Sequence, residues 1–583
     1  MSERAAHLLE QLEKLIRQET EVQRKQMESQ WSLPLSERVR TGKAIEGLCL
    51  AGINAKTGHL RLTCQTNNSR FREGDYLFLH KSHPLLEQAV ECVLEMDEEK
   101  QLEVFPQGNA RRLLGDPEGW IADEGFMDLS GYYLDALREV ADRQIGRTRI
   151  LPLILGDIGP EIDLASYERG WEAAFAAGLN ENQAEAVAQA YATDLVYLVQ
   201  GPPGTGKTLV LAHIARLLAE EGERVFVTAL THRAINNALD KIADVAPDVP
   251  VCKIGHPARA DGLSVENYDS FDQSRFGQIA GGYIIGATPF STRTNRLCEV
   301  EFDTVLFDEA SQITLPLAIM GMLVGKRYVF IGDDRQLPPV TTLQNPSQLS
   351  QESIFSFLNG RGYEEMLTLT YRLNDRLIEW PSRTFYDNLL QPAPTVGERR
   401  LKLEAVPERW REILDPEQPA IFVDLFGRNT TVRSHREAEV ITDLVLALLQ
   451  GGVPPKEIGV VSPYRAQGRE IRNRLRRLVP DRNVRRGVVV DTVERMQGQE
   501  REVILVSLAT SSPYFATELA DFFFQPQRIN VTITRPRTKL IIVGSSLVLQ
   551  AKPEEPEMVE WVRLFQDLLR SCTLYTMTYG EEF

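Results

Sequence analysis

The feature that most constrains the fold is the run Gly201-Pro-Pro-Gly-Thr-Gly-Lys-Thr208, which fits the pattern G-x-x-x-x-G-K-[ST]. It follows the apolar run DLVYLVQ and precedes TLVLAHIARLLAEEG, a run typical of a helix. A strand, a glycine-rich loop and a helix in this order predict a loop whose backbone N–H groups bind phosphate. The predicted nucleotide-binding residues here are Gly201, Pro202, Pro203, Gly204, Thr205, Gly206, Lys207 and Thr208.

The rest of the chain suggests several domains, because 583 residues exceed the usual length of one. Short β-rich runs lie between two amphipathic helical stripes near the N-terminus, and two later series of apolar strands alternate with helices. We therefore expect an α/β protein with a small β-barrel on a two-helix stalk, followed by two tandem RecA-like domains. The expected parts are a stalk helix (1–43), the barrel (44–110), the returning stalk helix and a linker (111–170), the first α/β domain (171–345) and the second (346–583).

Two adjacent carboxylates, Asp308 and Glu309, end the apolar run Val305-Leu-Phe307. Charges at the end of a buried strand are costly unless they have partners, and a metal ion and a water molecule are the natural ones. We predict that Thr208 and Asp308 hold Mg²⁺ and that Glu309 activates the attacking water. A plain helix N-cap pair is the alternative.

Further motifs narrow the class of nucleotide-binding protein to which the sequence is similar. The runs Asp308-Glu-Ala-Ser-Gln312 and Gly332-Asp-Asp-Arg-Gln-Leu-Pro-Pro339 resemble motifs II and III of superfamily 1 helicases. The family's remaining motifs appear in its order along the chain. Leu179-Asn180-x-x-Gln183-x-x-Ala186-Val187 resembles the Q motif, Tyr371-Arg372 the arginine-bearing motif, Gln497-Gly-Gln-Glu500 motif V and Arg528-x-Asn-Val-x-x-Thr-Arg535 motif VI. The likeness is greatest to the 5′→3′ branch that contains the nonsense-mediated decay helicase and the immunoglobulin mu-binding helicase.

This resemblance implies ATP as the nucleotide and a role for each motif residue. Gln183 would contact the adenine edge and Tyr371 would stack on the base, while Gln336 would sense the γ-phosphate. Arg372 and Arg535 would be arginine fingers supplied by the second domain, which neutralise charge on the transferred phosphoryl group. Glu500 would bind the ribose or support a finger.

The resemblance also implies that single-stranded DNA or RNA lies across both domains, held through its phosphates. Thr231, Thr288 and Thr492 occupy the motif positions expected to contact it, although isolated threonines are usually ordinary loop residues. A net charge of −17 argues against a broad nucleic-acid-coating face, so the strand should be gripped locally. We expect a monomeric, cytoplasmic motor without a membrane segment.

Two departures from the family pattern concern residues of these motifs. Thr231 and His232 stand where relatives usually carry Ser-Asn, so the grip on the strand would differ. Pro536 follows the proposed finger where the family has a small residue. Because proline restricts the preceding residue, we expect it to end a short helix directly after Arg535.

Nine arginines lie between Pro463 and Arg486, against only Glu470 and Asp481. The segment would be an ordinary amphipathic surface helix or an edge that follows phosphates.

Three functions remain open from the sequence. The first is a helicase that moves on single strands. The second is an ATPase that remodels protein–nucleic acid complexes with little unwinding, which the motifs do not distinguish from the first. The third is a nucleotide-binding clamp that does not hydrolyse, and the presence of Lys207, Glu309, Gln336, Arg372 and Arg535 argues against it.

Overall fold

The computed structural model describes residues 2–577, apart from 55–57, 68, 72–73, 85–88, 98–99, 108–115, 261, 344–346 and 427–428. These residues form two units. One consists of Met1–Leu151 with Val340–Gln351, and the other of Pro152–Pro339 with Glu352–Phe583.

The first unit contains a closed antiparallel barrel whose strands follow the order β1-β2-β5-β4-β3-β6. Alternate residues of its strands, such as Leu60 and Leu62, point into an apolar core, as the period of two in the sequence predicts. The barrel expected from the sequence is thus confirmed. Its strands are β1 (Ala44–Ile53), β2 (Leu60–Thr63), β3 (Tyr76–His80), β4 (Val90–Asp97), β5 (Gln101–Pro106) and β6 (Trp120–Glu124).

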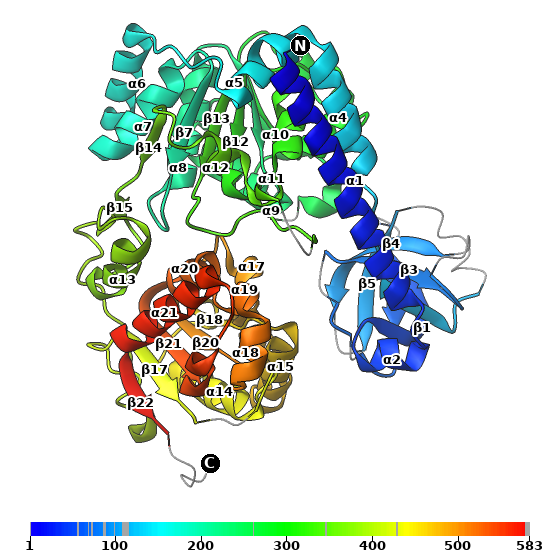
Figure 1. Cartoon of the computed structure of the whole chain (residues 1–583), viewed down its shortest axis with the longest axis vertical. Coiled ribbons are helices and arrows are strands. Elements are labelled where there is room, and N and C mark those ends of the chain that lie inside the picture. The colour runs from blue at the N-terminus through cyan, green and yellow to red at the C-terminus, as the bar shows by residue number, and fades with distance from the viewer. Residues whose placement is uncertain are drawn as a thin grey trace. The chain divides into compact units, whose positions relative to one another are not determined.

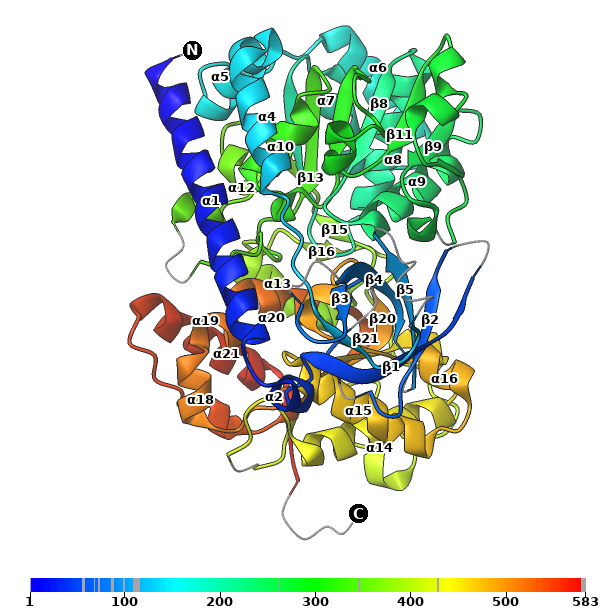
Figure 2. The same ribbon diagram turned by 90° about the vertical axis from the view of Figure 1, so that its right-hand side faces the viewer.

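The stalk consists of α1 (Glu3–Trp31) and α4 (Ser130–Asp142), which pack side by side (Figure 2). Leu8, Leu12 and Ile16 of α1 are buried, as is Val140 of α4. A short helix, α2 (Leu35–Arg40), joins the stalk to the barrel, and a π-helical turn (Gly146–Ile150) follows α4. The predicted two-helix stalk is therefore present.

The first sheet of the second unit has eight parallel strands in the order β10-β9-β11-β8-β12-β13-β7-β14. Figure 1 shows β14, β7, β13 and β12 of this sheet side by side. Its inner strands are apolar throughout because helices cover both faces. The strands are β7 (Val196–Gln200), β8 (Arg224–Thr228), β9 (Val251–Ile254), β10 (Glu266–Tyr268), β11 (Tyr283–Gly286), β12 (Thr304–Phe307), β13 (Arg327–Gly332) and β14 (Glu364–Met366).

The strand order fixes the faces on which the helices of this sheet lie. The chain moves one way through the sheet from β7 to β9 and the other way from β11 to β14. Right-handed crossovers therefore place α8 (Lys207–Glu220) and α9 (His232–Val245) opposite α10 (Leu315–Met322) and α12 (Ile354–Leu358). The helices α6 (Leu164–Ala176) and α7 (Glu181–Ala192) extend the row of α8 and α9.

A second parallel sheet follows, in the order β19-β18-β20-β21-β17-β22. Each face of it carries its own apolar core, so that Ile421 and Val423 belong to one and Phe422 to the other. Its strands are β17 (Ala420–Asp424), β18 (Ile458–Val461), β19 (Val489–Asp491), β20 (Arg501–Ser507), β21 (Pro536–Gly544) and β22 (Thr573–Thr576).

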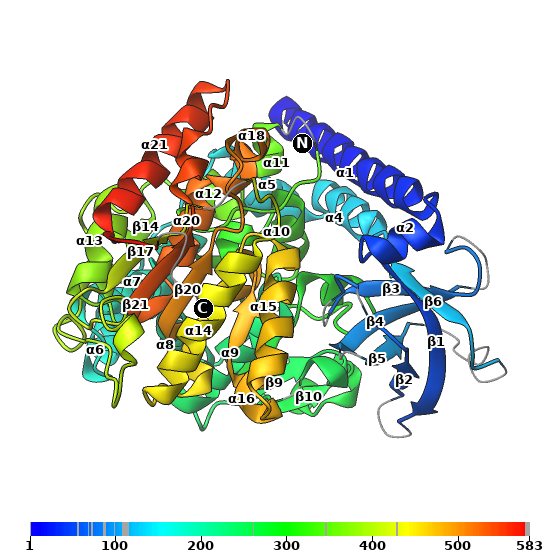
Figure 3. The same ribbon diagram turned by 90° about the horizontal axis from the view of Figure 1, so that it is seen from below.

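The helices α14 (His435–Gln450) and α15 (Arg465–Leu478) lie side by side on one face of this sheet (Figure 3). The remaining helices of the region are α13 (Asp375–Phe385), α16 (Arg482–Gly487), α17 (Val493–Met496), α18 (Pro513–Glu518), α19 (Ala520–Phe523), α20 (Pro526–Ile533) and α21 (Pro556–Ser571). Among the described residues, no helix is both long and apolar enough to cross a bilayer.

The structural elements continue past two of the expected boundaries. The positions predicted at 110 and 345 fall among 108–115 and 344–346, outside the described residues. However, β6 closes the barrel as far along the chain as Glu124, and β14 still pairs with β7 of the first sheet. The segment Val340–Gln351 belongs with the stalk, where Thr341 Oγ1 donates a hydrogen bond to Glu19 Oε1 at 2.6 Å.

Candidate active site

The glycine-rich loop connects β7 to α8 at the carboxyl end of the first sheet. The N–H of Gly201 donates to the carbonyl of Gly332 at 2.8 Å, which anchors the loop to the end of β13. Gly204 and Gly206 have φ of 75° and 86°, a left-handed conformation that glycine adopts without strain. Gly206 is the N-cap of α8 and has no side chain to cap it, so the positive end of the helix faces the loop.

The side chain of Lys207 lies back along this loop, where its Nζ donates to the carbonyl of Gly201. Burial raises the pKa of Asp333, and the positive charge of Lys207 opposes the rise both there and at Asp308. Burial, and then the charge of Glu309, nevertheless raise the pKa of Asp308. A cation held at Asp308 would oppose that rise.

Glu309 adopts a strained backbone conformation directly after β12. Its φ is 50°, in the left-handed region that residues with a Cβ rarely occupy. Its N–H donates to Asp308 Oδ1 at 3.0 Å, and its Oε2 accepts from Gln497 Nε2 at 3.4 Å. The backbone turn therefore aims this carboxylate away from the strand and toward the second sheet's Gln497 loop.

Arg535 reaches from the second sheet to the first. Its Nη2 donates to Gln336 Oε1 at 3.1 Å, while Nε and Nη1 donate to the carbonyls of Val531 and Gln499. Only 1% of Arg535 is exposed. Burial, and then the like charge of Arg372, lower the pKa of Arg535 to about 9, so it is still charged at neutral pH.

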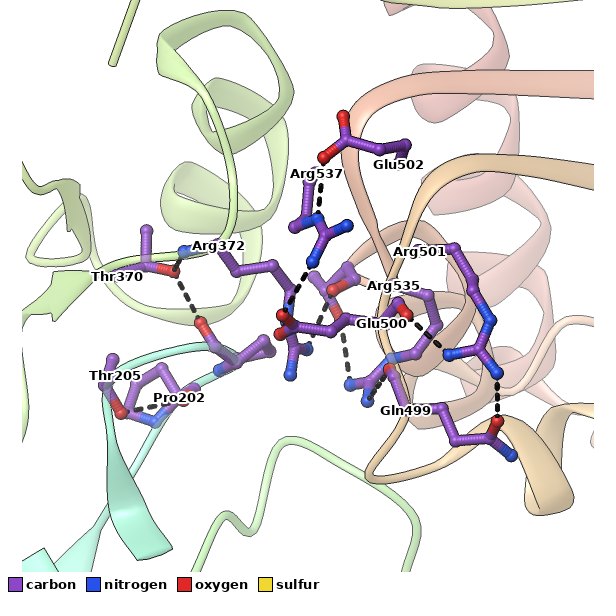
Figure 4. A network of polar contacts seen from close by, with 12 residues as sticks. Pro202, Thr205, Thr370, Arg372, Gln499, Glu500, Arg501, Glu502, Arg535 and Arg537 are labelled. Carbon is purple, nitrogen blue, oxygen red and sulfur yellow. Dashed lines mark hydrogen bonds and ion pairs between the residues drawn. The ribbon is translucent and has the colours of Figure 1, made fainter. Parts of the chain in front are cut away.

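Arg372 is fixed by Glu500, and Figure 4 shows both between the loop residues Pro202 and Thr205 and the Arg535 side chain. Arg372 Nε lies 2.7 Å from Glu500 Oε2, and its Nη1 donates to the carbonyl of Thr534 at 3.1 Å. Burial alone would raise the pKa of Glu500, but Arg372 and Arg537 hold it below its ordinary value. Of the two predicted roles, this geometry favours support of a finger over contact with ribose.

Three residues that the sequence did not single out complete the site. Asp333 Oδ2 accepts from Gln336 Nε2 at 2.7 Å and from the hydroxyl of Tyr386 at 2.8 Å. The Tyr386 hydroxyl in turn accepts from Asn530 Nδ2 at 2.8 Å. Asp333 and Asn530 lie inside the motifs that begin at Gly332 and Arg528, and that position is their signal in the sequence. Tyr386 carries no motif signal.

The two residues predicted to bind the base lie beside the loop. Gln183 Nε2 donates to the carbonyl of Thr205 at 3.0 Å, and Gln183 forms a reciprocal capping box with Asn180. The hydroxyl of Tyr371 accepts from Asn180 Nδ2 at 2.9 Å, and its N–H donates to the carbonyl of Gly204. Tyr371 is 41% exposed, so it is accessible for stacking.

The predicted strand-contacting threonines each precede a helix at the carboxyl end of a strand. Thr231 follows β8, Thr288 follows β11 and Thr492 follows β19. In open parallel sheets, this end of the strands is where ligands bind. Thr231 Oγ1 also accepts from the N–H of Ala234, so part of its function is to cap α9.

The fold and this site define a P-loop nucleotide-binding protein with two tandem α/β domains. Two family models, each described as an AAA domain, match residues 178–354 and 350–547. The chain is 29% identical over 437 residues to the DNA replication ATP-dependent helicase/nuclease DNA2 of Saccharomyces cerevisiae, covering 68% of this chain and 27% of that protein. It is 26% identical over 538 residues to an uncharacterized ATP-dependent helicase of Methanocaldococcus jannaschii, covering 74% of this chain and 77% of that one.

These relatives are ATP-dependent helicases, which agrees with the resemblance of the motifs to those of superfamily 1 helicases. The chain spans only about a quarter of the length of the yeast relative. Among solved structures, the arterivirus nonstructural protein 10 helicase aligns with a TM-score of 0.38 at 15% identity, over 89% of this chain and 83% of that chain.

Proposed function

We propose that this chain is an ATP-dependent helicase that moves as a monomer along single-stranded DNA or RNA, 5′→3′, and separates duplexes. The observation that carries the proposal is the approach of two arginines to the candidate nucleotide site of the first sheet. Arg535 contacts Gln336 of the first sheet, and Arg372 lies against Gly204. A binding-only clamp has no need of these arginines, whereas hydrolysis uses them to neutralise transition-state charge.

The nucleotide would be held from the adenine to the γ-phosphate by residues of the first sheet. Tyr371 would stack on the base and Gln183 would contact its edge. The backbone N–H groups from Gly201 to Thr208 would bind the phosphates, and Lys207 would leave the Gly201 carbonyl to reach the β- and γ-phosphates. Gln336 would detect the γ-phosphate through its link to Asp333.

Mg²⁺ fits the donor set beside Lys207. Thr208 and Asp308 offer a hydroxyl and a carboxylate, the hard oxygen ligands that this ion prefers, and Asp308 is 5% exposed. When bound, the ion would neutralise charge on the β- and γ-phosphates. Glu309, turned outward by its left-handed backbone, would orient the attacking water and accept its proton.

Movement along the nucleic-acid strand would depend on the arginines that join the two sheets. Hydrolysis removes the γ-phosphate near Gln336 and thereby changes what Arg535 and Arg372 contact. The sheets would then open and close against each other while Thr231, Thr288 and Thr492 hold backbone phosphates. Such contacts carry little sequence information, which suits a motor that travels along any sequence.

The test compares wild type with Glu309→Gln on duplexes with either a 5′ or a 3′ single-stranded tail. We expect strand-stimulated ATP hydrolysis and unwinding only from the 5′ tail. The Gln variant should bind ATP normally but hydrolyse it about 10² to 10⁴-fold more slowly, since the general base is lost.

The outcomes separate the three functions. Hydrolysis that strands stimulate without duplex separation would indicate a remodelling ATPase. Unchanged turnover in the Gln variant would rule out the assigned base, and absence of any turnover in wild type would leave a clamp. Matched DNA and RNA strands in the same assay show which polymer is preferred.

A further inference from the structure

The seven arginines on one side of α15 and α16 form a surface that the site above does not use. We call this surface the arginine edge. Its members are Arg465, Arg469, Arg472 and Arg476 of α15 and Arg482, Arg485 and Arg486 of α16.

The α15 members lie on one flank of the helix because they recur at intervals of four, three and four residues. The buried residues Ile471 and Leu475 mark the face that packs on the sheet. Arg472 Nη1 donates to the carbonyl of Val490 in β19 at 2.7 Å, which turns this flank toward the outermost strand of the sheet. The row extends for about 16 Å at the usual helical rise.

The helix α16 continues the row. Arg485 Nη1 donates to the carbonyls of Val479 at 2.7 Å and Pro480 at 2.6 Å, which fixes the start of α16 against the end of α15. Arg482 and Arg486 on the same short helix are exposed. The two helices lie next to each other along one side of the sheet (Figures 2 and 3).

Two ion-paired acids lie at the flank of α15 that carries Glu470 and Arg474. Glu470 Oε1 is 2.9 Å from His435 Nδ1 and its Oε2 is 3.9 Å from Arg433, while Arg474 pairs with Glu439 at 2.7 Å. Asp481 accepts a hydrogen bond from the N–H of Asn483 as the N-cap of α16. Glu470 and Glu439 are therefore engaged by His435, Arg433 and Arg474, none of which belongs to the arginine edge.

The composition of the segment from Pro463 to Arg486, which contains the arginine edge, indicates the kind of ligand that it would bind. All nine of its cations are arginine and none is lysine. A helix that needs only solubility can use either residue, whereas the planar guanidinium matches phosphate oxygens in two parallel hydrogen bonds. The edge strand β19 ends next to Thr492, so the surface begins beside a residue predicted to contact the strand.

We propose that the arginine edge binds the phosphate backbone of nucleic acid outside the groove between the sheets. This inference rests on the proposed function and adds a second contact surface to it. It would also let a chain of net charge −17 bind a polyanion, since seven arginines are gathered on one side of one helix pair.

The test measures the salt dependence of binding to a labelled single strand and to a tailed duplex. The edge variant is Arg465→Gln, Arg469→Gln and Arg476→Gln, which leaves the Arg472 contact with Val490 intact. The matched control is Arg433→Gln, Arg474→Gln and Arg477→Gln. It removes the same charge from the other flank of α15, at Arg474 and Arg477, and from the neighbouring Arg433.

The slope of the logarithm of the binding constant against the logarithm of salt concentration should become less steep when three phosphate contacts are lost. The expected change is about 2 for a single strand and about 3 for a duplex. Between 50 and 200 mM salt, wild-type affinity should therefore fall about 20-fold to 40-fold more than that of the edge variant. The control should keep nearly the wild-type slope, and ATP hydrolysis without nucleic acid should be equal in all three proteins.

Each remaining outcome decides a separate point. An effect only on the tailed duplex assigns the surface to the double-stranded part, and an effect on both ligands assigns it to the single strand. Equal slopes in the edge variant and the control, whether changed or not, overturn the inference. If wild type binds neither ligand, the proposed function itself fails.

Discussion

At the scale of single residues, Gly204 shows how the site depends on more than the loop pattern. The pattern leaves this position free, yet a Cβ here would lie 2.4 Å from Arg372 Cβ and 2.6 Å from Thr370 Oγ1. Thr370 Oγ1 donates to the carbonyl of Pro203 at 2.7 Å. Glycine therefore allows the segment that carries Arg372 to lie directly against the phosphate-binding loop.

We expect Gly204→Ala to reduce strand-stimulated kcat/KM for ATP by about 10²-fold, because displacing a catalytic group by about 1 Å has an effect of that size. The control is Gly222→Ala, since Gly222 also has a positive φ, of 95°, but open space around it. This control should lose about 1 kcal/mol of stability and little activity. Similar activity losses in both variants would show that backbone strain, and not contact with Arg372, is responsible.

Residues that stand in local sequence patterns could be chosen as candidates for the site, whereas residues that join it only through distant contacts could not. Lys207, Asp308 and Glu309 stand in short patterns directly after apolar strands. Tyr386 contacts Asp333 at a separation of 53 residues and Asn530 at a separation of 144. No periodicity or motif around Tyr386 records either partner, so only the fold reveals it.

At the scale of elements, strands and helices followed from periodicity, whereas their ends depended on tertiary contacts. The segment before Pro536 illustrates this. Helix α20 ends at Ile533, two residues earlier than expected, and β21 begins at Pro536 itself. Proline disfavours a helical conformation in the residue before it, which is Arg535. The finger therefore lies between two elements, and the carbonyl of Arg535 accepts from the N–H of Arg501 at 3.1 Å.

The first turn of α14 contains a buried carboxylate that joins two elements. Glu437 Oε2 accepts from Ser507 Oγ and from the N–H of Ala509, both at 2.7 Å, at the end of β20. Gln467 of α15 donates to the same Ser507 hydroxyl at 2.9 Å. Burial raises the pKa of Glu437 to about 7 from its ordinary 4.5, although these hydrogen bonds oppose the rise.

This pKa predicts a specific pH dependence of stability. Between pH 4.5 and 7 the unfolded chain releases the Glu437 proton while the folded chain keeps it, so its contribution to stability is lost as pH rises. Relative to Glu437→Gln, wild type should therefore become less stable by about 2 to 3 kcal/mol between pH 5 and pH 8. Urea unfolding of both proteins at pH 5 and at pH 8 measures this difference in stability.

The control for this prediction is Glu439→Gln on the same helix. Glu439 is 31% exposed and pairs with Arg474 at 2.7 Å, so its charge is not confined to the interior. The stability difference between this variant and wild type should change little with pH. A wild-type protein that gained stability relative to Glu437→Gln as pH rose would show that Glu437 is ionised in the folded state.

At the scale of the two-sheet unit, polar contacts link residues of the first sheet to those of the second. Arg535 meets Gln336, Gln497 meets Glu309, and Tyr386 lies between Asp333 and Asn530. The first two links involve residues that act directly on the nucleotide in the proposed mechanism. The Tyr386 link is set back from the nucleotide and fully buried, so we interpret Tyr386 as a positioning residue for Gln336 and Arg535.

Tyr386→Phe tests whether this link serves turnover. Removing the hydroxyl leaves Asp333 and Asn530 each without one buried partner, which should lower the free energy of unfolding by about 1 to 3 kcal/mol. If the link holds Gln336 and Arg535 in place for the transition state, strand-stimulated kcat should fall about tenfold, whereas KM for ATP should change less than about twofold. ATP consumed per base pair opened should rise, because movement and hydrolysis lose their common connection.

Tyr514→Phe, at a position 73% exposed, should match wild type in all three measurements. A Tyr386→Phe protein with a lower urea midpoint but wild-type kcat and ATP use would assign the hydroxyl to stability alone.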